Sequence, residues 1–287
     1  MLTSFRNNLS LFICKNRWLN RMFRNFINEI SFLKIHEQLT LFIYTRDLGG
    51  PAFLTLRRGF EAYELASKQE ISQFIPENGG VFFDVGANIG LYSFYFYLKK
   101  KDIQIYAFEP IPRMVKCIQK SCEASQIQNI QIFDKALSNQ DDVEIELYLN
   151  TVNDGNHSIE QKIIHRESKK GQYVKIHTAK LDTLVKQINP PTIHAIKIDV
   201  EGLEYQVLEG AVQTLEKFQP ALQIECQHQS FLEENNLLDF LQAIPNTQYK
   251  AKEVGKPDVL SLGDLPQIAQ EKLKKGHTFA DYIFFCD

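Results

Sequence analysis

Short apolar runs alternate with helix-like patterns along most of the chain. The runs are typical of strands buried on both faces, and most of the stretches between them repeat apolar residues every three or four positions. The expected strands are 81–85, 104–108, 129–133, 194–199, 221–226 and 281–286. The expected helices are 59–75, 91–100, 111–125 and 203–218. Strands that alternate with helices indicate an α/β fold with a mainly parallel sheet.

One section follows a different pattern. Residues 143–150 and 172–178 alternate polar and apolar side chains, and the segment between them is polar and rich in turn-forming residues. This pattern predicts a two-stranded insertion with a long loop, placed after the third strand of the sheet. A loop at that place can fold over the carboxyl end of the sheet as a lid.

The first forty residues have a character of their own. Apolar residues recur at steps of three and four from Leu9 to Leu33, which predicts an amphipathic helix, and six basic residues stand against two acidic ones. Such a helix packs on the main domain or on a second subunit of a homo-oligomer, or lies on an anionic membrane surface. We favour packing, because basic amphipathic helices are common. We divide the chain into an N-terminal helical extension, residues 1–58, and a main domain, residues 59–287.

Composition narrows the classes of function. The 287 residues carry a net charge of −3, which provides no global basic field for a nucleic acid partner. The five cysteines show no CxxC pair and no metal-ligand spacing, which suits a reducing compartment. No stretch approaches the roughly 20 apolar residues of a membrane span. The sequence predicts a cytoplasmic protein, membrane-peripheral if residues 1–40 bind a bilayer.

The first expected strand ends in a turn that suits a cofactor. The segment DVGANIG places Gly86 and Gly90 where the strand becomes a helix, with Asn88 between them. Ligands of open α/β sheets bind outside the carboxyl ends of the strands, and glycine lets the backbone approach them closely. Asp84 replaces the first glycine of a dinucleotide fingerprint, and its carboxylate would repel a pyrophosphate. A ligand with a cationic centre, such as S-adenosylmethionine, fits this turn better.

Further acidic residues stand where an adenosine could be held. Glu109 ends the second expected strand, where a carboxylate can accept hydrogen bonds from both hydroxyls of a ribose. Asp134 follows the third strand and is placed to accept from an adenine amino group, or to cap the next loop. Glu61, upstream of the first strand, is either a ligand of the cofactor's ammonium group or a surface acid. These positions favour an adenosine-containing cofactor.

Candidates for catalysis surround the fourth and fifth strands. Asp199 ends the fourth strand, Glu201 follows it, Glu225 ends the fifth strand, and His228 lies three residues beyond. His157 lies in the polar loop of the insertion. Asp199, Glu201, His228 and His157 could each remove a proton from an acceptor hydroxyl.

A metal ion is the alternative to a protein base. Asp199, Glu225 and Glu201 could hold Mg²⁺ through oxygen ligands, and the ion would lower the pKa of the acceptor hydroxyl. We favour metal-free transfer, because these acids do not form a cluster tight enough to demand an ion.

Six segments together resemble the FkbM-type methyltransferases. They follow that family's order and rough spacing over about residues 59–225, and they are DVGANIG, AFEP, DKALS, LDTLV, IKIDVEGLEYQVLEG and QPALQIE. The resemblance implies a class I methyltransferase fold, which is a Rossmann-like, seven-stranded, mainly parallel sheet, and S-adenosylmethionine as the cofactor. It also implies O-methylation of a hydroxyl, usually on a sugar or on a polyketide-type product.

Two other classes of function stay open. An NAD-dependent Rossmann oxidoreductase would share the fold, although Asp84 argues against its cofactor. A non-catalytic cofactor-binding subunit would keep the binding turn without turnover. We expect an O-methyltransferase that acts on a sugar, a glycan or a glycosylated precursor. No motif names the acceptor.

Overall fold

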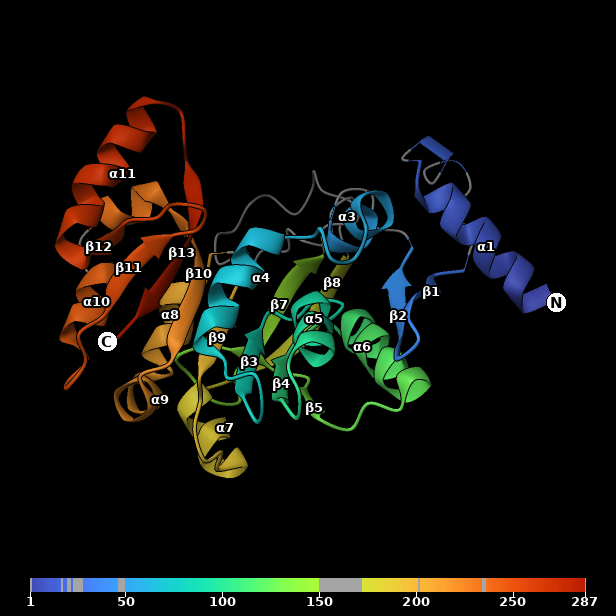
Figure 1. Ribbon diagram of the computed structural model, residues 1–287, viewed down its shortest axis with the longest axis horizontal. Coiled ribbons are helices and arrows are strands. Elements are labelled where there is room, and N and C mark those ends of the chain that lie inside the picture. The colour runs from blue at the N-terminus through green and yellow to red at the C-terminus, as the bar shows by residue number, and fades with distance from the viewer. Residues whose placement is uncertain are drawn as a thin grey trace.

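The structure is a computed structural model. It describes residues 2–16, 18–19, 22, 28–45, 50–149, 172–200, 202–233 and 236–286. Helix α1 (Leu2–Cys14) is followed by a hairpin of strands β1 (Ile30–His36) and β2 (Leu39–Tyr44), and by helix α3 (Pro51–Arg58). The central sheet and its helices come next, and Figure 1 shows the sheet in the middle of the molecule with α1 at one end.

The central strands run mostly in one direction. Their bounds are β3 (Val81–Val85), β4 (Gln104–Phe108), β5 (Ile130–Phe133), β9 (Ala195–Ile198), β10 (Ala221–Gln227), β11 (Lys250–Glu253), β12 (Val259–Ser261) and β13 (Phe279–Phe285). In the described part of the chain they form an eight-stranded sheet in the order β12-β11-β13-β10-β9-β3-β4-β5. From β10 to β5 the strands are parallel, whereas β13 runs antiparallel between β10 and β11. The expected Rossmann-like sheet is confirmed, with β12 added at the edge of seven strands.

Helices cover both faces of this sheet, because its central strands are apolar on both sides. One face carries α4 (Leu65–Ile71), α5 (Leu91–Lys99) and α6 (Pro112–Ser125). The other carries α7 (Leu181–Ile188), α8 (Glu204–Glu209), α9 (Val212–Phe218), α10 (Leu237–Ala243) and α11 (Leu265–Lys274). The neighbours Phe82 and Phe83 show the alternation, since each is fully buried in the core of a different face. The described residues also include three short 3₁₀ turns: Ser72–Phe74, His228–Leu232 and Leu262–Asp264.

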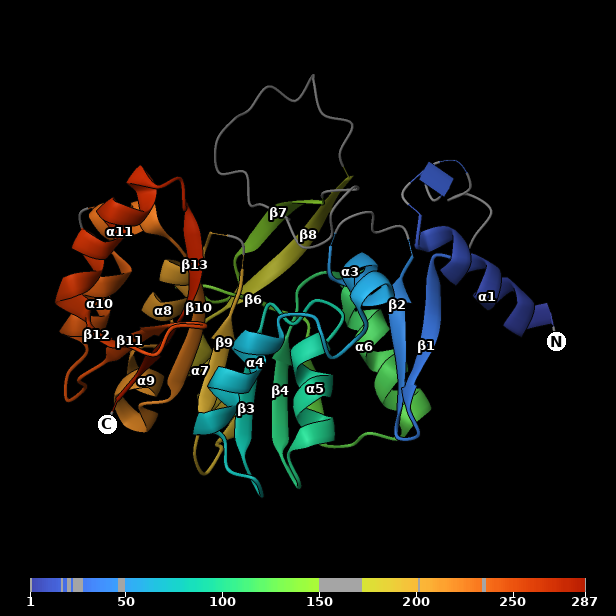
Figure 2. The same ribbon diagram turned by 45° about the horizontal axis from the view of Figure 1, so that its top comes forward.

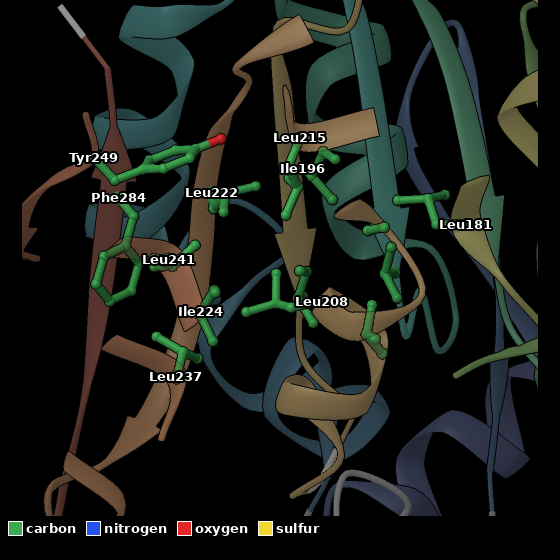
Figure 3. Close-up of a cluster of buried hydrophobic side chains, with 14 of the residues drawn as sticks. Leu181, Ile196, Leu208, Leu215, Leu222, Ile224, Leu237, Leu241, Tyr249 and Phe284 are labelled. Atoms are coloured by element: carbon green, nitrogen blue, oxygen red, sulfur yellow. The ribbon is translucent and has the colours of Figure 1, made fainter. Parts of the chain in front are cut away.

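The hydrophobic core on the second face packs against β9 and β10, the strands whose ends carry the expected catalytic acids. Figure 3 shows Leu208 of α8 and Leu215 of α9 beside Ile196, Leu222 and Ile224 of β9 and β10. All five side chains are fully buried. Burial of one such side chain contributes about 1.5–3 kcal/mol to stability. This packing therefore fixes the positions of β9 and β10 and of the acids at their ends.

Two of the expected helices differ from the prediction. The helix over 59–75 begins only at Leu65, because Glu64 adopts a left-handed backbone with φ 46°. The helix over 203–218 divides into α8 and α9. Between them lies Gly210, where an added Cβ would come within 2.1 Å of the carbonyl oxygen of Ser138. Contacts with distant residues decide both differences.

The insertion after the third central strand is a small sheet of its own. Strands β7 (Glu144–Leu149) and β8 (Gln172–Ala179) pair antiparallel as predicted. A short strand, β6 (Ala136–Leu137), pairs with β8 and makes the insertion three-stranded among the described residues. Figure 2 shows this sheet beyond the ends of the central strands. The loop predicted to be a lid lies outside the described residues.

The N-terminal part is not one long helix. Ile30 and Leu33, which were expected on a helix, lie in β1, and the inner side chains of β2 join the core of the main sheet. The hairpin packs on α6, where the amides of Thr40 and Phe42 donate to the hydroxyls of Ser125 and Ser121. A domain division after residue 58 stays a prediction. Within the described residues, no helix has the length and apolar content that crossing a bilayer requires.

Candidate active site

A cavity lies at the carboxyl ends of β3, β4 and β9. Its polar lining comes from Glu64, Asn88, Glu109, Lys135, Lys197 and Asp199. Its apolar lining includes Val85, Phe108, Leu137, Leu147 and Ile176. Two of these apolar residues, Leu147 and Ile176, belong to the inserted sheet, so the insertion forms one wall. A pocket with apolar walls and a few convergent polar groups is the usual form of a small-molecule site.

The turn after β3 brings two strand ends together. Gly86 has φ 73°, and an added Cβ there would lie 1.9 Å from the carbonyl oxygen of Asp199. The ammonium group of Lys197 donates to the carbonyl oxygen of Gly86 at 2.9 Å. Gly90 also has a left-handed backbone, with φ 82°, and precedes α5. Only glycine fits at position 86 without displacing the end of β9, and Gly86 itself lines the cavity.

Glu109 presents a buried carboxylate at the end of β4. The residue is 4% exposed, and its two oxygens accept from the amides of Asn88 and Ile111, each at 2.8 Å. Burial raises the pKa of Glu109 to about 7, although both hydrogen bonds lower it. Each oxygen can accept one more hydrogen bond. This arrangement suits a ligand that carries two adjacent hydroxyl donors.

Asp84 lies beneath the cavity and is not part of its lining. One carboxylate oxygen accepts from the amide of Ser93 at 3.0 Å and from its hydroxyl at 2.6 Å, which ties α5 to β3. The other oxygen has no hydrogen-bond partner among the described residues and lies 4.0 Å from the ammonium of Lys197. Burial raises the pKa of Asp84. The structure therefore makes this residue a support of the turn.

Lys197 and Asp199 form an ion pair at the end of β9. Their charged groups lie 3.0 Å apart, and the side chain of Lys197 is 6% exposed against 34% for Asp199. Burial lowers the pKa of Lys197, but the carboxylates of Asp199 and Asp84 raise it more, so the lysine stays charged. The ammonium also lies 5.5 Å from the ring centre of Tyr92. Sequence reasoning missed this lysine, although a charge inside the apolar strand AIKI requires a partner.

Glu64 occupies the position that was expected for Glu61. Its carboxylate lines the cavity and accepts from the hydroxyl of Tyr92 at 2.9 Å. Glu61 instead pairs with Lys99 at 2.9 Å and is 64% exposed. The late start of α4 turns Glu64 inward. The sequence GFEAYE contains both acids and no local signal that separates them.

A second buried lysine holds the same wall of the cavity. Lys68 is fully buried, and its ammonium donates to the carbonyl oxygen of Tyr63 at 2.6 Å. The rings of Phe60, Tyr63, Tyr92 and Tyr95 surround it at 5.2–5.6 Å. Burial lowers its pKa to about 8. Cation–π contacts replace part of the lost hydration, and they fix Tyr63 and Tyr92, which line the cavity.

Asp134 and His228 also lie outside the cavity lining. Asp134 is exposed, and its neighbour Lys135 lines the cavity instead. His228 is fully buried, with one ring nitrogen 2.9 Å from the carbonyl oxygen of His277 and the other 3.2 Å from the hydroxyl of Tyr282. A histidine held at both nitrogens within the core is a packing residue. The strand-end motif by itself did not reveal this.

Glu225 lies beside the cavity and outside its lining. It pairs in register with Asp281 across β10 and β13, and it is exposed. Partial burial, together with the charges of Asp199 and Asp281, raises the pKa of Glu225 to about 7. Within the part of the chain that the structure describes, no three or more His, Cys, Asp or Glu side chains are grouped to hold a metal ion. His157 and Glu201 lie outside the described residues.

Comparison with known proteins points to one family. The family described as "Methyltransferase FkbM domain" matches residues 84–251, more than half of the chain. A curated protein named "Methyltransferase 1" from Beauveria bassiana (strain ARSEF 2860) is 26% identical over 141 residues. The match covers 44% of this chain and 56% of that protein, so the chain spans about half the length of this relative.

Two solved structures illustrate the similarity in three dimensions. The crystal structure of "Methyltransferase FkbM" from Methylobacillus flagellatus KT aligns with a TM-score of 0.44 at 13% identity, covering 94% of this chain and 70% of that one. The structure of TYW2 from M. jannaschii in complex with AdoMet aligns with a TM-score of 0.45 at 9% identity, covering 91% of this chain and 88% of that one.

Proposed function

Because the chain belongs to the FkbM methyltransferase family, we propose that it transfers a methyl group from S-adenosylmethionine to a hydroxyl of a sugar, a glycan or a glycosylated precursor. The observation that carries this proposal is that Glu109, Glu64 and Asp199 all line one cavity. A ribose diol, an ammonium group and an acceptor hydroxyl each need an acceptor oxygen at a different point. These three carboxylates supply one each.

The cavity fits the cofactor by the chemistry of its donors and acceptors. Glu109 offers two oxygens to the ribose hydroxyls, and the turn from Gly86 to Asn88 brings the backbone close to the ligand. Apolar side chains such as Leu137 and Ile176 offer a surface for the adenine ring. Glu64 is the group that would hold the α-ammonium of the methionine part. Asp84 would act through the turn that it supports.

The protein's catalytic task is positioning and proton removal. The bound cofactor supplies an electrophilic methyl group, so an acceptor hydroxyl that is held in line needs only modest help. The carboxylate of Asp199 would accept the hydroxyl proton as the new carbon–oxygen bond forms. Lys197, 3.0 Å away, keeps that carboxylate oriented. Glu225 and the two undescribed candidates, His157 and Glu201, stay alternatives for this base.

A polyol acceptor suits the charge around the cavity. Asp199 and Glu64 line it, and Glu225 and Asp281 lie beside Asp199 on the next strands. Carboxylates accept hydrogen bonds from hydroxyls, and they repel phosphates. The balance therefore favours a neutral sugar over a nucleic acid as the acceptor. The family assignment leaves the NAD-dependent alternative without support.

The test has two stages. Titration calorimetry with S-adenosylmethionine and S-adenosylhomocysteine should detect binding of both, whereas binding of NADH alone would refute the proposal. A screen of sugars, sugar nucleotides and glycans by mass should then find a product heavier by one methyl group. Cofactor binding without any product in a broad screen would favour the non-catalytic subunit.

Replacement of Asp199 separates a protein base from a metal ion. Asp199→Asn should lower kcat by about 10²–10⁴-fold and leave the cofactor Kd nearly unchanged, because the adenosine contacts lie elsewhere. A chelator should not affect turnover by the parent enzyme. Loss of activity with a chelator, restored by Mg²⁺, would instead indicate metal-assisted transfer through Asp199 and Glu225. A parental rate in Asp199→Asn would contradict both versions.

A further inference from the structure

Helix α1 and the described residues that follow it leave large apolar side chains exposed. Four of the ten exposed large hydrophobic residues in the described part of the chain lie within residues 9–22. They are Leu9, Phe12, Trp18 and Met22, with exposed fractions of 43%, 66%, 65% and 53%. We call these four side chains the N-terminal apolar surface. Such a concentration of exposed apolar side chains marks an interaction site.

The opposite side of α1 is already occupied. Ile13 and Cys14 are buried and pack with Leu56 of α3, and the thiol of Cys14 donates to the carbonyl oxygen of Thr45. We expect from the sequence that the helix packs on the main domain. This packing covers only the side of α1 that carries Ile13 and Cys14. Leu9 and Phe12 project elsewhere. Figure 2 shows α1 at the end of the molecule, away from the central sheet.

The surroundings of this surface are basic. Residues 1–40 contain six basic and two acidic side chains, although the whole chain has a net charge of −3. Lys15 directly follows α1 and is exposed. Arg57 and Arg58 are exposed directly after Leu56, the residue that packs against α1. The occupant should therefore be both apolar and anionic.

We propose that the N-terminal apolar surface binds the face of an anionic lipid bilayer. Aromatic rings such as those of Trp18 and Phe12 insert at the level of the lipid headgroups, while neighbouring cations pair with anionic lipids. A second copy of the chain is a poorer occupant, because a two-fold interface would bring the same positive charges together. The proposal is independent of the methyl-transfer reaction.

Trp18 is the chain's single tryptophan, so it reports directly on this contact. The full-length protein should be titrated with phosphatidylcholine vesicles that either contain or lack phosphatidylserine. Phosphatidylserine vesicles should shift the Trp18 emission to shorter wavelength and sediment the protein, and high salt should reverse both effects. Vesicles of phosphatidylcholine alone should do neither.

Three variants sharpen the test. Phe12→Ser keeps the reporter and should weaken vesicle binding by about tenfold, because it removes one inserted ring. Lys15→Gln should weaken it by about fivefold, as expected for one cation near the surface. Phe279→Ser is the matched control: this residue is 62% exposed in β13, far from α1, and its replacement should change nothing. Circular dichroism should verify that all three fold.

Two results would overturn the proposal. One is an emission spectrum that phosphatidylserine vesicles leave unchanged. The other is a blue shift that appears without vesicles, increases with protein concentration and coincides with a dimer in light scattering, because a second copy would then cover the surface. Equal losses in Phe12→Ser and Phe279→Ser would also count against it, because binding would then not depend on α1.

Discussion

Glu109 shows how one buried carboxyl group can link cofactor binding to pH. Burial raises its pKa to about 7, although two backbone hydrogen bonds and the charge of Lys197 lower it. Hydroxyl donors from a ribose would favour the ionised form. Binding should therefore be strongest above pH 7 and weaken as the pH falls through that value and Glu109 becomes protonated.

The prediction for Glu109 uses its neutral isostere. Glu109→Gln should weaken S-adenosylmethionine binding by about 1–3 kcal/mol at pH 8. It should also remove most of the change in Kd between pH 6 and pH 8. Calorimetry at both pH values measures the two effects. A variant that binds as weakly as expected but keeps the full pH dependence would place the titrating group elsewhere.

Glu61 and Glu64 provide a comparison of two acids three residues apart. Only Glu64 lines the cavity, whereas Glu61 pairs with Lys99 on the surface. Glu64→Gln should therefore weaken cofactor binding by about tenfold, since it removes a charge from the proposed ammonium site. Glu61→Gln should leave the Kd unchanged, because an exposed pair contributes little. Equal effects in the two variants would refute the placement of the methionine part.

At the level of elements, the ends of β3 and β9 depend on each other. Gly86 adopts φ 73° and lies against the carbonyl oxygen of Asp199, so any side chain there must push β9 away. The same movement would displace the Lys197–Asp199 pair, because Lys197 also bonds to the carbonyl oxygen of Gly86. A change in the turn at Gly86 should therefore also move Asp199, the proposed base.

A matched pair of glycines tests this coupling. Gly86→Ala should destabilise the fold by roughly 3–4 kcal/mol, the sum of a left-handed backbone and a steric clash. Gly255→Ala is the control, because Gly255 has φ 79° but no atom within 4 Å of the added Cβ. It should cost about 1–2 kcal/mol. Urea unfolding curves measure both, and equal losses would show that the contact with β9 contributes nothing.

Across the whole molecule, several acids with raised pKa values gather around one edge of the sheet. Burial raises the pKa of Asp84, and it raises the pKa of Glu109 to about 7 and that of Asp281 to about 6. Partial burial together with the charges of Asp199 and Asp281 raises the pKa of Glu225 to about 7. A carboxyl group whose pKa is higher in the folded than in the unfolded protein stabilises the fold at low pH. That contribution is lost as the pH rises through the folded pKa. Ionisation of these carboxyl groups should therefore lower the stability of the ligand-free protein as the pH rises.

The ligand-free protein should melt at a lower temperature at pH 7.5 than at pH 5. Glu109 alone contributes about 2 kcal/mol across this window, which corresponds to a fall in Tm of roughly 4–8 °C. Scanning calorimetry measures the slope, and Glu109→Gln should flatten it. Lys68 has the opposite sign, since its pKa is lowered to about 8, but it acts above this window. A Tm that rises from pH 5 to pH 7.5 would contradict the prediction.

The sequence by itself determined the features that follow from local sequence pattern, namely the strands and the residues at their ends. Apolar runs such as 81–85 predicted buried strands, and the positions of Glu109 and Asp199 at strand ends predicted that both would line one cavity. Local pattern suffices here, because parallel strands bring their carboxyl ends to the same edge. The alternating pattern of the insertion predicted β7 and β8 for the same reason.

Only the tertiary structure decided which side chains reach the cavity. Glu64 lines the cavity and Glu61 does not, His228 is buried in the core, and Asp84 lies beneath the cavity. Four aromatic rings also surround Lys68. These outcomes depend on contacts between residues far apart in the chain and on where a helix begins. A side chain's direction follows from such contacts, and no local spacing encodes them.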